Sequence, residues 1–144
     1  MRAGLILCHI GLFGVLLAAG AGNAAAQQGS WIELGVGSAS RISTSAYIPG
    51  NTGKGTVCSI RLKLDGAGVE LNGMTVHFGN GQTMRFVVDD KVGPDSTSKT
   101  SSLPGPPRTV RGLDIVYSLQ DKSLPPPAIH LWGYSMPNVD GCPR

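Results

Sequence analysis

Apolar and polar residues alternate along much of the chain, most clearly in residues 57–64. The apolar residues of this stretch occupy every second position: Cys58, Ile60, Leu62 and Leu64. A period of two is the pattern of a strand with one side in a core and the other in solvent. Similar alternation over residues 69–78 and 84–88 predicts two further strands.

The Gly-Asn-Gly segment at residues 79–81 predicts a tight turn between these two strands, and the apolar pattern fixes its length. A two-residue loop would place Met84 opposite the polar His77 and mix the two sides. A three-residue loop keeps the apolar residues together through three pairs: Phe78–Gln82, Val76–Met84 and Met74–Phe86. We therefore predict a type I turn with Gly81 in the left-handed conformation, which forms a bulge.

Two later segments complete the strand pattern. Residues 108–119 alternate except at Arg111 and Gly112, and a slip beside a glycine predicts a β-bulge. Residues 128–134 form a last strand that is apolar on both sides. Proline clusters separate the segments, and the mature chain carries no sustained helical stripe. About eight short strands predict an all-β fold, a single sandwich or barrel.

The first 26 residues have the three parts of a secretory signal peptide. Arg2 supplies the positive start, residues 5–19 form an apolar run, and three alanines at 24–26 fit the cleavage pattern. The run is shorter than the ~20 residues that a membrane-spanning helix needs, so we expect cleavage and no membrane anchor. The mature chain is then residues 27–144, a single domain that is periplasmic or secreted.

The net charge limits the classes of partner that the chain can bind, and the cysteine count indicates the compartment. The formal charge of +3 falls to +2 when Arg2 is removed, and the basic residues form no run. This distribution argues against a nucleic-acid partner and offers no patch for a membrane surface. Two cysteines remain, Cys58 and Cys142, and an even count in an exported chain predicts one disulfide bond. The alternatives are an intermolecular bridge or two free thiols.

Two stretches suggest a cofactor at first sight. Residues 49–56, PGNTGKGT, look like a phosphate loop, but Gly55 stands where the hydroxyl residue belongs and a strand pattern follows. The carboxylates of Asp89, Asp90 and Asp95 suit calcium by type, yet their spacing matches no calcium loop and turn formation explains them better. We therefore expect no cofactor and no metal site.

The last strand carries the best candidate for a ligand-binding surface. His130, Trp132 and Tyr134 share one side of it. If the other side belongs to the core, this side presents an aromatic row that can stack on sugar rings or on peptide side chains. The alternatives are a strand buried on both sides and a Trp132 side chain that packs under a loop. Arg108 and Arg111 are candidate anion-binding groups beside the row. The alternative is that each frames the bulge or donates to a loop carbonyl.

The residues that could support catalysis are few. The mature chain has two histidines and no nucleophile elbow, and His77 alternates onto the solvent side. We expect a non-catalytic envelope module that binds or supports an unknown ligand or protein. The alternative is a small secreted hydrolase or lyase acting on envelope polymers, using His77 or His130 with Asp114 or Asp140. A third hypothesis is an inhibitor whose proline-rich loop, residues 103–108, enters a protease cleft.

Five short motifs follow one another along residues 31–134. They are W-x-x-L-G at 31–35, an I-x-L-x-V-like strand at 60–64, V-x-F-x-N-G at 76–81, L-x-G-x-x-R-x-V at 103–110 and W-G at 132–133. Their order resembles a widespread bacterial family of exported β-domains of unknown function. The resemblance implies a jelly-roll-like antiparallel sandwich at the cell envelope and carries over no reaction or catalytic residue. The chain departs from the pattern in its prolines at 104–107 and its Cys142 tail.

Overall fold

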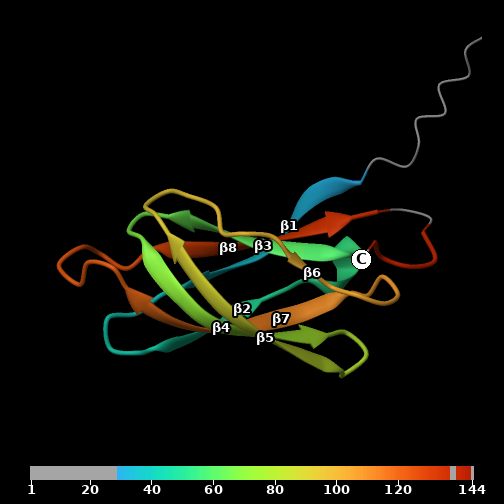
Figure 1. Ribbon diagram of the computed structural model, residues 1–144, viewed down its shortest axis with the longest axis horizontal. Coiled ribbons are helices and arrows are strands. Elements are labelled where there is room, and N and C mark those ends of the chain that lie inside the picture. The colour runs from blue at the N-terminus through green and yellow to red at the C-terminus, as the bar shows by residue number, and fades with distance from the viewer. Residues whose placement is uncertain (1–28, 137–138, 144) are drawn as a thin grey trace, which may run out of the picture.

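The structure, a computed structural model, describes residues 29–136 and 139–143 (Figure 1). The predicted signal peptide, residues 1–26, lies outside this part. Within it the chain is all-β, apart from a three-residue 3-10 helix at Thr52–Lys54. The eight strands are β1 (Ser30–Ser38), β2 (Ser45–Pro49), β3 (Ser59–Asp65), β4 (Val69–Phe78), β5 (Thr83–Val92), β6 (Ser101–Ser102), β7 (Val110–Leu119) and β8 (Ala128–Ser135). No helix in the described ranges is long and apolar enough to cross a membrane.

The strands pair from the outside of the sequence inwards: β1 with β8, β2 with β7, β3 with β6 and β4 with β5. The chain is thus one long hairpin whose successive pairs fall alternately in two sheets. The first sheet has the order β1-β8-β3-β6 and the second β2-β7-β4-β5. This arrangement is the jelly roll, so the expected antiparallel sandwich is confirmed. Figure 1 shows the two sheets as packed layers.

The tip of the long hairpin is the predicted turn between β4 and β5. The Phe78 N–H donates to the Gln82 carbonyl at 2.9 Å, and the Gly81 N–H donates to the Phe78 carbonyl at 3.0 Å. Gly81 has φ of +86°, in the left-handed region that glycine adopts without strain. Val76 lies opposite Met84. The three-residue loop with its bulge is therefore confirmed.

The predicted bulge in β7 is also present. Along β4, His77 pairs with Gly112 and Phe78 pairs with Val110, which leaves Arg111 as the extra residue. A bulge of this kind re-aims the side chain of the unpaired residue. The Arg111 side chain is exposed, on the surface of the second sheet.

The core lies between the two sheets and takes alternate residues of each strand. Side chains less than 2% exposed include Ile48, Ile60, Leu62, Phe78, Leu113, Ile115, Ile129 and Leu131. Tyr117, in β7, is the largest of the fully buried side chains. Its hydroxyl accepts from the Ser40 N–H at 2.6 Å and donates to the Ser40 carbonyl at 3.1 Å. This contact fastens the segment after β1 to the second sheet.

We expect Tyr117→Phe to lower the free energy of unfolding by about 1–3 kcal/mol, because both Ser40 backbone groups lose their partner. Tyr47→Phe is the matched control. The Tyr47 side chain is 50% exposed and its hydroxyl reaches the Arg111 carbonyl at 3.3 Å, so its loss should cost less than ~0.5 kcal/mol. Urea unfolding followed by tryptophan fluorescence measures both changes. Equal losses in the two variants would contradict the assigned role of Tyr117.

Cys58 and Cys142 form the predicted intramolecular disulfide. Their Cα atoms are 5.2 Å apart although 84 positions separate them in the chain. The Cys142 N–H also donates to the Gly105 carbonyl at 2.9 Å. The C-terminal segment is therefore held against the start of β3 and against the proline-rich loop.

Candidate functional site

β8 lies inside its sheet, between β1 and β3. Ile129 and Leu131 are fully buried, whereas His130, Trp132 and Tyr134 are only partly buried and lie on the outer side. The alternative of a strand buried on both sides is therefore wrong. Registers with β1 and β3 place more side chains around the row. The aromatic face, as we use the term, consists of Trp31, Glu33, Arg61, Lys63, His130, Trp132 and Tyr134.

The rings at one end of the aromatic face pack together. Trp31 and Tyr134 are opposite each other across β1 and β8, with ring centres 5.2 Å apart and planes at 54°. The Arg61 guanidinium carbon, which comes from β3, lies 3.9 Å from the centre of the Trp31 ring. A cation over an indole is attracted by the negative face of the ring. These contacts link all three strands across the outer surface.

A histidine–carboxylate pair occupies the other end of the aromatic face. His130 Nδ1 lies 2.6 Å from Glu33 Oε1, and the two side chains are 27% and 39% exposed. The bond fixes the orientation of the imidazole ring, as a carboxylate partner generally does. Nε2 is then the ring nitrogen available to a ligand.

A hollow of about 410 Å³ lies beside this pair. It is lined by Glu33, Lys63, Leu64, Asp65, Asp95, His130 and Trp132. The Trp132 indole N–H is screened from solvent, and it has no hydrogen-bond partner in the part of the chain that the structure describes. Because that N–H is covered by protein, the polar groups that the hollow offers to a ligand include those of Glu33, Lys63 and His130.

Neither predicted arginine joins the aromatic face. The Arg108 guanidinium carbon lies 3.8 Å from the centre of the Phe78 ring, and Nη2 donates to the Pro104 carbonyl at 3.0 Å. Arg111 belongs to β7, in the opposite sheet. Their placement beside His130 is wrong, and the predicted alternative holds: Arg108 donates to a loop carbonyl and Arg111 is the extra residue of the bulge in β7. Alternation shows the side of a strand but not the sheet to which the strand belongs.

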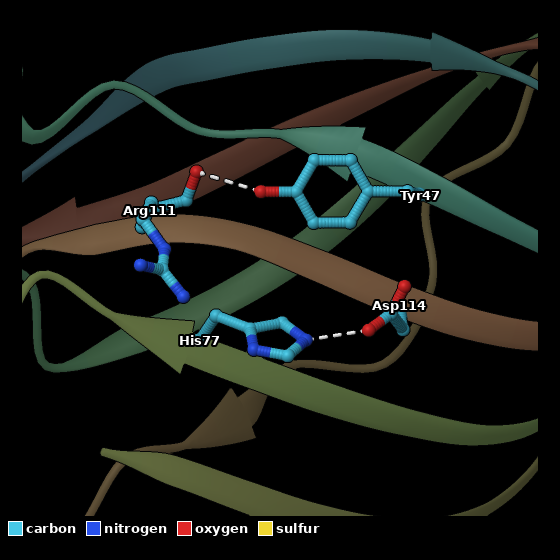
Figure 2. Close-up of polar contacts among 4 residues, drawn as sticks. All are labelled: Tyr47, His77, Arg111 and Asp114. Carbon is cyan, nitrogen blue, oxygen red and sulfur yellow. Dashed lines mark hydrogen bonds and ion pairs between the residues drawn. The ribbon is translucent and has the colours of Figure 1, made fainter. Parts of the chain in front are cut away.

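His77 forms a second histidine–carboxylate pair, on the outer side of the other sheet (Figure 2). Its Nε2 lies 2.5 Å from Asp114 Oδ2, and the His77 side chain is 22% exposed. The Tyr47 ring lies edge-on to the imidazole at 6.1 Å between centres. Figure 2 also shows the Arg111 carbonyl, which accepts from the Tyr47 hydroxyl at 3.3 Å. His77 is on the solvent side as predicted, but it is partnered and not simply exposed.

Glycines shape the surface around this second pair. A Cβ on Gly112 would collide with the Tyr47 ring, so the tyrosine lies across the space that a side chain would fill. Gly73 leaves a hollow of about 370 Å³ that Asp114 also lines. The sequence did not predict the packing of Tyr47 over Gly112 or the hollow beside Gly73, because both depend on how β2, β4 and β7 pair.

The family comparison covers most of the chain. A family model described as a domain of unknown function (DUF2541) matches residues 7–133. The chain belongs to the DUF2541 family. No curated protein and no solved structure matches this chain. The DUF2541 match includes β1 to β7 and β8 as far as Gly133, so it contains both histidine–carboxylate pairs, while Cys142 lies beyond it.

Two of the three carboxylates that suit calcium by type, those of Asp90 and Asp95, accept structural hydrogen bonds in this DUF2541 chain. Asp90 Oδ2 accepts from the Lys99 N–H, and Asp95 Oδ1 accepts from the Gly66 N–H, both at 2.8 Å. Within residues 29–136 and 139–143, no three His, Cys, Asp or Glu side chains gather into a metal site. These bonds fasten the crossing from β5 to the neighbouring sheet.

Proposed function

We propose that this DUF2541 chain is an exported, non-catalytic domain of the bacterial envelope that binds a glycan on the aromatic face. The observation that carries the proposal is Trp132. It lies on the outer side of an interior strand and lines a hollow together with Glu33, Lys63 and His130. The predicted signal peptide and the Cys58–Cys142 disulfide support export.

The chemistry of the aromatic face suits a sugar better than an apolar ligand. A pyranose ring offers a flat C–H side to an indole and hydroxyl groups that both donate and accept. Glu33 supplies an acceptor and Lys63 supplies donors. A purely apolar ligand would cover these polar groups without satisfying them, which costs free energy.

The test is glycan binding by the oxidised mature chain. Thermal shift with a panel of peptidoglycan fragments and oligosaccharides comes first, since a ligand at a hundred times its Kd adds ~2.7 kcal/mol of stability. Calorimetry then compares variants. We expect Trp132→Ala to weaken binding by about thirtyfold, equivalent to ~2 kcal/mol for a central aromatic contact. Tyr47→Ala, on the opposite sheet, is the control and should leave affinity unchanged. A panel without a hit, or a Trp132→Ala variant with full affinity, would contradict the proposal.

A hydrolase or lyase is the second candidate, and the His77–Asp114 pair favours it. Among the described residues no serine, threonine or cysteine side chain bonds to His77, so the pair would act as a general base on water. Asp140 bonds to neither histidine in that part of the chain. Product analysis after incubation with the same glycans separates the candidates. Turnover that is lost in His77→Ala and kept in Trp132→Ala would establish catalysis at the second pair.

The protease-inhibitor hypothesis rests on the loop at 103–108, and its contacts do not strengthen it. Leu103 is 1% exposed and belongs to the core. Arg108, the only charged side chain of the loop, folds back onto the Pro104 carbonyl and the Phe78 ring. The exposed part is limited to residues 104–106.

A further inference from the structure

β5 is the terminal strand of its sheet. In the order β2-β7-β4-β5 it pairs with β4 alone, whereas the strand at the other end, β2, has 5 residues against 10 in β5. A terminal strand exposes a row of backbone N–H and carbonyl groups that another strand can pair with. Long terminal strands are commonly protected by lysine, proline, a β-bulge or a covering loop. β5 carries Lys91, and its register with β4 shifts between Val87 and Asp90, so the protection falls in its second half and the residues up to Val87 decide whether the edge is open.

The centre of β5 is apolar and bare. Val87 is 95% exposed. Its neighbour on β4 is Gly73, which has no side chain, and beyond Gly73 lies Val116, 49% exposed. Val87 therefore has no side chain to pack against in the adjacent strand. In a terminal strand that is protected against pairing, a charged side chain commonly occupies a position like that of Val87.

We propose that β5 pairs antiparallel with β5 of a second copy of this chain, about a two-fold axis at Val87. This register sets Arg85 opposite the partner's Asp89, and it repeats the pair by symmetry. Both residues are exposed on the outer side, as is Val87 itself. Opposite charges directly across two strands are favourable, and the two Val87 side chains cover each other.

The inner side of β5 fits the same register. Phe86 and Val88 are partly buried and pack against the core. With the two-fold axis at Val87, Phe86 lies opposite the partner's Val88, so apolar side chains are paired on the inner side as well. An axis at Phe86 would set Arg85 against Val87, and an axis at Val88 would set Val87 against Asp89. The Val87 axis is the register that matches both sides of the strand.

The dimer would join two four-stranded sheets into one continuous sheet of eight strands. Because the axis is perpendicular to that sheet, the other sheets of both copies lie on its same side. Their aromatic faces then point in the same direction. If the proposed glycan site is correct, one dimer presents two sites to a repeating polymer, which raises avidity. The dimer itself does not depend on that function.

Sedimentation velocity of the oxidised mature chain over a concentration series tests the pairing. We expect a concentration-dependent dimer for the wild type and a monomer for Val87→Lys, whose exposed site tolerates lysine. Arg85→Asp and Asp89→Arg should each weaken dimerisation by about tenfold or more, because two attractive pairs become repulsive. The double variant R85D/D89R restores both pairs with reversed sign and should regain the wild-type dimer. A wild-type monomer throughout, or a double variant no better than the single ones, would overturn the proposal.

Cysteine trapping supplies an independent readout of the register. Val87→Cys places a thiol on the two-fold axis and should yield a disulfide-linked dimer under mild oxidation. Val116→Cys is the control, because it is exposed on the same sheet but away from the edge, and it should stay monomeric. Cross-linking of both variants to the same extent would refute pairing at Val87. Neither readout involves a glycan, so failure of the glycan site leaves this result unchanged.

Discussion

Reducing the Cys58–Cys142 disulfide is expected to lower the free energy of unfolding by about 4 kcal/mol. The bond closes a loop spanning 84 positions. In the chain-entropy model a loop of this length removes that much conformational freedom from the unfolded chain. For a mature chain of this size, the loss corresponds to a fall of about 15 °C in Tm. The C-terminal segment would lose its covalent connection to β3 at the same time.

Scanning calorimetry with and without reductant measures the effect on the wild-type chain. The double variant Cys58→Ala/Cys142→Ala is the control, and its Tm should not respond to reductant. Its Tm should lie near that of the reduced wild type, lowered slightly further because Cys58 is buried and alanine leaves a small cavity. A shift below ~3 °C on reduction would show that the native contacts of the C-terminal segment do not require the bond.

The parts of the fold that the sequence predicted correctly are those fixed by near neighbours. Alternation at 57–64 places the core residues of β3 because a strand turns successive side chains to opposite sides. The Gly81 turn follows from keeping Val76 opposite Met84. β2, Ser45–Pro49, and the two-residue β6 offered too few alternating positions to be recognised. Their place depends on pairing with distant strands.

In the candidate site, too, the residues that the sequence did not predict are those brought together by pairing of distant strands. Trp132 and His130 were found because they share one strand. Glu33 was missed, since 97 positions separate it from His130 and only the β1–β8 register brings them together. The signal was nevertheless present: a jelly roll pairs its first and last strands, so Trp31 and Glu33 should flank the row on β8. Arg111 was predicted to lie beside the row on β8, and this was wrong because its strand, β7, belongs to the other sheet.

Gly35→Ala is expected to destabilise the fold by about 3 kcal/mol, at the upper end for overpacking. Gly35 is the last residue of the W-x-x-L-G motif and follows a register shift in β1 after Glu33. A Cβ at this position would collide with the Pro49 carbonyl at the end of β2. β1 and β2 belong to different sheets, so their close approach forms a corner of the sandwich. Relief would require backbone movement, not a change of rotamer.

Gly73→Ala is the matched control, because Gly73 also lies inside a strand and its nearest contact to a new Cβ, the Phe86 carbonyl oxygen, is an ordinary 3.6 Å away. Alanine there should be neutral or stabilising by a few tenths of a kcal/mol, since it restricts the unfolded chain. Urea unfolding of both variants distinguishes steric conflict from a general effect of losing glycine. Equal stability in the two would mean that the corner can open without cost. The glycine of the motif would then need another explanation, such as the bulge that turns Glu33 toward His130.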